Sequence, residues 1–151
     1  MGEAAAVNAS PLIYLSRVGR LELLRLSAAR IVVPQAVVDE IRAWPTADSA
    51  VKAIETERWL EVVSPVPVES SILAWDLGAG ESAVIAWGRG NPETEVIIDD
   101  LAARRCAATL GIPIRGTLGL VLVAKRRGLI PSARPILDEL LNAECIFRDP
   151  S

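Results

Sequence analysis

The sequence predicts an α/β fold in which a mostly parallel central sheet is covered by helices on both faces. Short apolar segments alternate with helical patterns along the chain, which is the order expected of parallel strands joined by crossover helices. The apolar segment at residues 96–98 ends in two carboxylates, Asp99 and Asp100, and an Ala- and Arg-rich helical pattern follows. In open α/β sheets, functional sites lie at the carboxyl ends of the strands.

Apolar runs mark the expected strands, at residues 4–7, 31–33, 60–63 and 96–98, with 145–147 as a closing edge strand. Apolar residues at helical spacing predict helices over residues 10–19, 21–26, 34–44, 46–58, 72–77, 81–87, 101–110, 118–127 and 132–141. Residues 112–114 form a brief apolar step between two of these helices. Hydroxyl residues at helix starts predict N-caps at Ser10, Thr46, Thr117 and Ser132.

The 151 residues fit one domain, spanning residues 1–151, with enough apolar content (51%) to bury a core. No linker or internal repeat divides the chain. No apolar run approaches the length of a membrane-spanning helix, and the N-terminal segment lacks the pattern of a signal peptide, so we expect a cytoplasmic protein. The two cysteines, Cys106 and Cys145, lie in apolar patterns and are expected to be buried thiols.

The amino-acid composition limits the catalytic chemistry and the ligands that the protein can have. The chain has no histidine, which excludes histidine-based triads and most zinc sites and leaves carboxylate, hydroxyl or lysine chemistry. The net charge is −3, so binding to nucleic acid would need a local basic patch. The one basic run, at residues 125–127, is more simply a solvated helix end. The four tryptophans are expected in core packing or a dimer surface, with base stacking as the alternative.

Five polar residues stand out by their positions. Asn8 ends the first strand, Glu40 lies within an otherwise apolar helical face, and Glu81 opens a helix after a Gly-rich turn. Asp99 and Asp100 end a central strand. The carboxyl ends of parallel strands share one crevice, where such residues can meet. Clustered carboxylates repel each other unless a cation lies among them, and hard oxygen ligands favour Mg²⁺ or Mn²⁺. Such ions serve phosphodiester cleavage and need no histidine.

Each acid also has a simpler interpretation. Glu81 could complement the dipole of the helix that it opens. One of Asp99 and Asp100 is expected to cap the following helix, whether or not the other binds a metal. Asp39 and Glu40 are adjacent, so a helix can direct one of them inward and at least one is a surface residue.

The other polar residues leave alternatives open. Asn8 could be a turn or cap residue. Thr117 is either an N-cap, which we favour, or a hydroxyl that supports the metal site. Arg104 could reach a phosphate or pair with an acid, although solvation on an exposed helix is the default for such a charge.

The chain resembles the PIN-domain proteins through four ordered blocks, VNASPLIYLSRVGRLELL, VPQAVVDEI, LGAGESAVIAWG and VIIDDLAARRCAATLGIPIRGTLGLVLVAKRRGLI. It is most similar to the prokaryotic PIN-like group that carries a GTLG motif and is related to VapC toxin ribonucleases. The resemblance implies a Rossmann-like, three-layer α/β/α fold and a Mg²⁺- or Mn²⁺-dependent ribonuclease of a toxin–antitoxin pair. It also implies RNA as substrate, a small antitoxin protein as partner, and a homodimer.

By position, the resemblance matches Glu40, Glu81 and either Asp99 or Asp100 to the family's acids, with Asp100 slightly favoured, and Ser10 to a small hydroxyl residue near the first acid. At the end of the first strand, however, the family has aspartate where this chain has Asn8. An amide can still offer a carbonyl oxygen to a metal, but the site loses one negative charge. The alternative function is therefore a catalytically weak or inactive PIN-like module that binds RNA or a protein.

Overall fold

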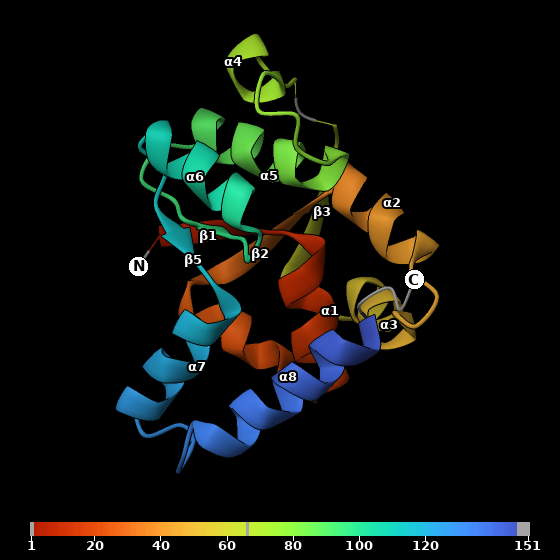
Figure 1. Ribbon diagram of the computed structural model, residues 1–151, viewed down its shortest axis with the longest axis vertical. Coiled ribbons are helices and arrows are strands. Elements are labelled where there is room, and N and C mark those ends of the chain that lie inside the picture. The colour runs from red at the N-terminus through yellow and green to blue at the C-terminus, as the bar shows by residue number, and fades with distance from the viewer. Residues whose placement is uncertain (1, 66, 148–151) are drawn as a thin grey trace.

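The computed structural model describes residues 2–65 and 67–147, without the side chains of residues 2 and 143–147. The described chain forms a five-stranded, all-parallel sheet in the order β3-β2-β1-β4-β5. Helices lie on both faces of this sheet, with α5 and α6 on one side and α1, α7 and α8 on the other (Figure 1). The predicted α/β/α architecture is confirmed.

The strands are β1 (Gly2–Val7), β2 (Ala28–Pro34), β3 (Leu60–Val63), β4 (Val96–Ile97) and β5 (Ile114–Arg115). The helices are α1 (Ala9–Arg17), the 3₁₀ helix η1 (Leu21–Leu26), α2 (Gln35–Ala43), α3 (Asp48–Thr56), α4 (Ser70–Leu73), α5 (Ala79–Gly90), α6 (Leu101–Thr109), α7 (Thr117–Arg126) and α8 (Arg134–Phe147). In the described part of the chain, no helix combines the length and the apolarity needed to cross a bilayer.

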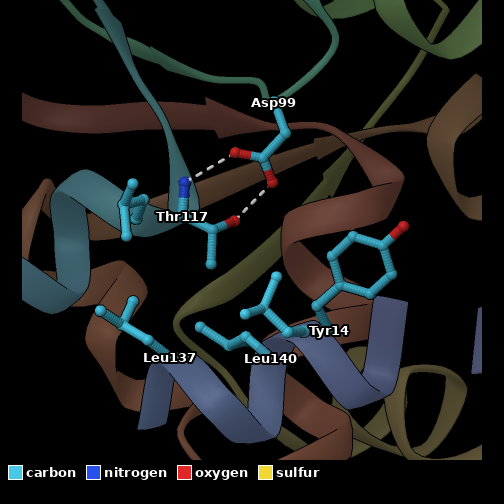
Figure 2. Close-up of a pocket in the computed structure, with 7 residues that line it drawn as sticks. Tyr14, Asp99, Thr117, Leu137 and Leu140 are labelled. Atoms are coloured by element: carbon cyan, nitrogen blue, oxygen red, sulfur yellow. Dashed lines mark hydrogen bonds between the residues drawn. The ribbon is translucent and has the colours of Figure 1, made fainter. Parts of the chain in front are cut away.

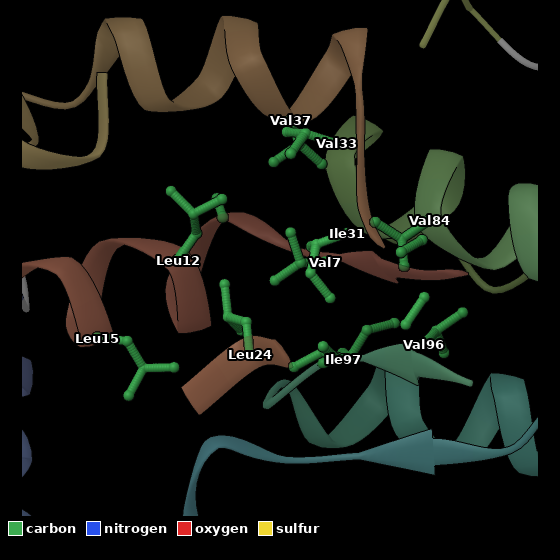
Figure 3. Close-up of a cluster of buried hydrophobic side chains, with 14 of the residues drawn as sticks. Val7, Leu12, Leu15, Leu24, Ile31, Val33, Val37, Val84, Val96 and Ile97 are labelled. Carbon is green, nitrogen blue, oxygen red and sulfur yellow. The ribbon is translucent and has the colours of Figure 1, made fainter. Parts of the chain in front are cut away.

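The core lies between the sheet and the helices, and branched aliphatic residues fill it. Val7, Ile31 and Ile97 come from three neighbouring strands and are fully buried. Leu12 and Leu15 of α1 meet them from one layer and Val84 of α5 from another (Figure 3). Strands that are buried on both faces need such continuous apolar runs, which is why the runs in the sequence located four of the strands well.

The structure corrects several predictions about helix ends. The predicted N-caps Ser10, Thr46 and Thr117 are wrong, because Asn8, Ala47 and Gly116 hold those cap positions. Ser132 lies two residues before α8 begins. The helix predicted at residues 72–77 is the short α4, Ser70–Leu73.

Two strand predictions also differ from the structure. Residues 145–147 belong to α8, not to an edge strand, and the four-residue spacing from Leu137 to Leu141 and from Leu141 to Cys145 continues the helical pattern. The apolar step at 112–114, which was not predicted as a strand, includes the first residue of β5, and β5 pairs with β4 at the sheet edge. Of the two cysteines, Cys106 is a buried free thiol, as predicted, whereas the side chain of Cys145 is outside the described residues.

Candidate active site at the carboxyl edge of the sheet

The strand order places the candidate residues. β1 lies between β2 and β4, because the strands run outward from β1 to β3 and the chain then crosses back to place β4 and β5 on the other side of β1. Ligands of open α/β sheets bind where the strand order reverses in this way, outside the carboxyl ends of the strands. Asn8 directly follows β1, and Asp99 lies two residues after β4. Glu40 is on the helix that follows β2, and Glu81 is in the first turn of α5.

Asn8 is almost fully buried, at 2% exposed. Its backbone N–H donates to the Ile97 carbonyl at 3.0 Å, which extends the pairing of β1 with β4 by one residue. Its side chain makes no hydrogen bond to the start of α1, and Oδ1 has no hydrogen-bond partner within the described residues. A buried acceptor without a partner costs about 1–3 kcal/mol. Asn8 therefore holds the N-cap position of α1 without a capping hydrogen bond from its side chain.

Glu40 and Glu81 converge on Gly78 and Gly80 at the start of α5, where the sequence predicts a turn. The N–H of Gly80 donates to Glu40 Oε1 at 2.7 Å. A Cβ atom on Gly80 would lie 2.6 Å from Glu40 Oε1, and one on Gly78 would lie 2.5 Å from Glu81 Oε2 and 3.8 Å from Glu40 Oε1. The two glycines therefore leave the space that the two carboxylates occupy, and neither position has room for another side chain as it stands.

Burial raises the pKa of the Glu40 carboxyl group above its ordinary value. The hydrogen bond from Gly80 lowers this pKa, and the neighbouring Glu81 carboxylate raises it. Among the described residues no cation contributes to the pKa of Glu40, so two acidic groups lie together there without a positive partner for Glu40. Asp39, the neighbour of Glu40 on α2, is exposed and accepts a hydrogen bond from Gln35, so Glu40 is the inward-facing member of that pair.

The two aspartates after β4 have different partners. Asp99 accepts two hydrogen bonds from Thr117, from the backbone N–H at 2.8 Å and from Oγ1 at 2.5 Å (Figure 2). Asp100 is exposed and caps α6 by accepting the Ala103 N–H at 2.9 Å. The prediction that one aspartate caps the following helix is confirmed, and that residue is Asp100. Thr117 is neither an N-cap nor distant from the acids.

A sequence model of the PIN-domain family matches residues 4–150. The chain belongs to the PIN-domain family. Its fold is therefore of a nuclease type, in a family whose members generally use divalent metals and for which RNA is a possible ligand. None of the curated proteins matches the chain.

The acids of this PIN domain form two groups. Glu40 lies with Glu81 in the first group, and Asp99 lies with Thr117 in the second. Among the described residues, no three His, Cys, Asp or Glu side chains are close enough to share one metal ion. The available donors nevertheless suit Mg²⁺ or Mn²⁺, because all of them are oxygen atoms and Asn8 Oδ1 is buried without a partner. The Glu40–Glu81 pair fits a cation best, and Asn8 Oδ1 is a further oxygen without a partner at the same edge of the sheet.

Two further features were not foreseen from the sequence. The sequence predicts a Gly-rich turn before Glu81, whereas the structure begins α5 at Ala79, and the lack of side chains at Gly78 and Gly80 leaves room for the two carboxylates. A groove of about 380 Å³ also lies beside Asp99 in this PIN domain (Figure 2). It is mostly apolar and is lined by Tyr14, Asp99, Thr117, Leu118, Leu137, Leu140 and Leu141.

The remaining predicted residues differ in their relation to the site. Ser10 is half-buried in the first turn of α1, two residues after Asn8. Arg104 is half-buried on α6 and donates to the Ile98 carbonyl, immediately before Asp99. The basic run at residues 125–127 is exposed at the carboxyl end of α7, whereas Thr117 is at its beginning. The structure therefore separates this run from the acids.

Proposed function

We propose that this PIN domain is a metal-dependent endoribonuclease of the VapC type that hydrolyses RNA phosphodiester bonds. The observation that carries the proposal is the Glu40–Glu81 pair at the start of α5. The two carboxylates lie together there, and burial raises the pKa of Glu40. Acidic residues with perturbed pKa values are typical of functional sites, and α/β sheets bind ligands at this carboxyl edge.

In this proposal Glu40, Glu81 and Asn8 Oδ1 would hold Mg²⁺ or Mn²⁺, and Asp99 completes the site from the β4 side. When bound, such an ion orients a water molecule and neutralises phosphate charge. We assign the late acid to Asp99 because Asp100 is exposed and engaged with α6. The resemblance to VapC proteins further supports a role as the toxin of a toxin–antitoxin pair, acting in the cytoplasm with a small antitoxin protein and as a homodimer.

The test is cleavage of labelled single-stranded RNA with Mn²⁺ or Mg²⁺, compared with the same reaction in EDTA. We expect Glu81→Gln to abolish metal-dependent cleavage, because it removes a charge from the pair and changes the side-chain volume little. Glu55→Gln is the matched control, since Glu55 is exposed on α3. Full activity in Glu81→Gln would refute the assignment.

Asn8 favours a second candidate, a weak or inactive PIN module that binds RNA or a protein. An amide takes the place of the expected first acid, and the carboxylates lie in two groups. The discriminating variant is Asn8→Asp. If a silent parent gains metal-dependent cleavage, the chain is a nuclease that has lost activity at this residue. If both forms bind RNA without cleaving it, the second candidate is favoured.

A further inference from the structure

The guanidinium group of Arg104 lies at the same edge of the sheet as the candidate acids. Arg104 is in the first turn of α6, is half-buried, and donates from Nη1 to the Ile98 carbonyl at 3.3 Å. That carbonyl belongs to the residue before Asp99. The backbone therefore fixes the position of a cation beside the site.

A glycine provides the space for this cation. A Cβ atom on Gly116 would overlap Arg104 Nη1, and it would also lie 3.2 Å from Asp99 Oδ1. Gly116 has φ −99° and ψ 166°, which any residue can adopt, so its backbone conformation does not require glycine. What requires glycine here is the close approach of Arg104 and Asp99.

No ion pair between described residues involves Arg104. The nearby acids are engaged elsewhere, since Asp99 accepts from Thr117 and Asp100 accepts from Ala103. A guanidinium group has five N–H donors, and a single carbonyl occupies few of them. Arg104 thus forms no direct ion pair with a described acid, and it presents several donors beside Asp99 at the carboxyl edge of the sheet.

A cation at this edge would offset the repulsion between the candidate acids and an RNA phosphate. The chain carries a net charge of −3, and the candidate site is built from carboxylates, so both repel a phosphodiester. The basic run at residues 125–127 is at the far end of α7 and leaves this repulsion unrelieved near the acids. Arginine is well suited to the task, because its planar fork matches a phosphate group.

We infer that Arg104 binds a backbone phosphate of single-stranded RNA beside the acid site. This inference depends on the proposed function for its substrate, but it concerns binding and not cleavage. It can therefore be measured without metal, in EDTA, by fluorescence anisotropy of a short labelled single-stranded RNA.

The decisive variants are Arg104→Gln, which removes the charge but keeps an N–H donor for Ile98, and Arg105→Gln as matched control. Arg105 is the next residue on the same helix and is exposed. We expect Arg104→Gln to weaken RNA binding about tenfold, as for a hydrogen bond to a charged group. The slope of log K against log[salt] should also fall by about 0.7, as for one lost phosphate contact on a single strand. Arg105→Gln should change neither quantity.

Gly116→Ala provides an independent perturbation, because the new methyl group must push the guanidinium group away while leaving its charge in place. We expect the same direction of change as for Arg104→Gln, and recovery of most of the salt slope in Arg104→Lys. Urea denaturation of each variant separates binding from stability. A lower unfolding midpoint with an unchanged salt slope in Arg104→Gln would mean that Arg104 is structural, and would overturn the inference.

The failure of the inference and that of the proposed function are distinguishable. If the parent binds RNA but does not cleave it, and Arg104→Gln weakens binding as stated, the nuclease proposal fails and the phosphate contact stands. If the parent cleaves RNA and Arg104→Gln binds as well as the parent, only the inference fails. A single-stranded DNA of the same sequence should show the same loss, and a loss confined to RNA would argue against a phosphate contact.

Discussion

Replacing Gly80 by alanine should damage the site while sparing the fold. The new Cβ atom would lie 2.6 Å from Glu40 Oε1, 2.8 Å from Cδ and 2.9 Å from Oε2. Ordinary van der Waals contact begins at 3.4 Å, so the carboxylate must retreat from 2.6 Å by about 0.8 Å. Because Glu40 is half-buried and its carboxylate is the end of a flexible side chain, this retreat is easy.

The stability and activity effects of Gly80→Ala should therefore separate. The hydrogen bond from the Gly80 N–H to Glu40 is weakened, at a cost of about 1–2 kcal/mol. Alanine in a helix recovers about 1 kcal/mol relative to glycine, so the free energy of unfolding should change by roughly 1 kcal/mol or less. A displacement of about 1 Å in a catalytic group can reduce the rate about a hundredfold. We expect a loss of that size in metal-dependent RNA cleavage.

Gly88→Ala is the matched control on the same helix. Its Cβ atom would meet Val96 Cγ1 at 2.8 Å and Ile112 Cγ2 at 3.1 Å, both in the buried core and away from the carboxylates. These short side chains cannot move freely, so overpacking should cost about 1–3 kcal/mol. Urea denaturation and cleavage assays at equal folded fraction compare the two variants. Wild-type cleavage by Gly80→Ala, or an equal loss of activity in Gly88→Ala, would refute the reasoning.

Variants at four positions probe the same edge of the sheet. Because folding raises the pKa of Glu40, the free energy of unfolding of the wild type should fall as pH rises above about 4.3, the ordinary glutamate value. Glu40→Gln should lack this fall. Urea midpoints that depend on pH in the same way in both proteins would contradict the prediction. Thr117→Val removes the hydroxyl donor to Asp99 and should lower the free energy of unfolding by about 1–3 kcal/mol, whereas Thr117→Ser should largely preserve it; equal urea midpoints for the two would be evidence against the contact. Asp100→Ala should lose about 1 kcal/mol of stability as a missing cap, and Asp100→Ser should recover it; no loss in the alanine variant would argue against capping. Asn8→Asp places an ionised group where the side chain is 2% exposed, so its thermal midpoint in EDTA at neutral pH should fall below that of the parent and rise on adding Mn²⁺; a midpoint insensitive to Mn²⁺ would exclude Asn8 from a metal site.

Four of the five strands, and the edge of the sheet at which the candidate site lies, could be predicted from the sequence. Apolar runs such as residues 60–63 are strands because a parallel sheet buries both faces, and Asn8 and Asp99 follow two neighbouring strands. The caps were less predictable. Ser10, Thr46 and Ser132 have the right chemistry for capping, but tertiary packing sets where each helix begins, and the structure begins them elsewhere.

The contact between Asp99 and Thr117 was hidden by one missed strand. β4 and β5 pair in parallel with Ile97 opposite Arg115, so two residues further along each strand bring Asp99 opposite Thr117. A two-residue strand after a proline has too little pattern to be found alone. Once it is known, the register by itself places the threonine against the aspartate, and Thr117 follows as a partner instead of a cap.

The two groups of acids differ in how far the protein's own hydrogen bonds stabilise their negative charge. Asp99 receives two hydrogen bonds from Thr117, which satisfy its charge within the protein. Glu40 receives one, from Gly80, and faces a second carboxylate, and its pKa is raised. A positive charge would therefore be stabilised most at Glu40 and Glu81, where two carboxylates lie together. In the unbound protein, the N–H of Gly80 offsets part of the burial and repulsion that raise the pKa of Glu40, and a bound cation would lower that pKa further.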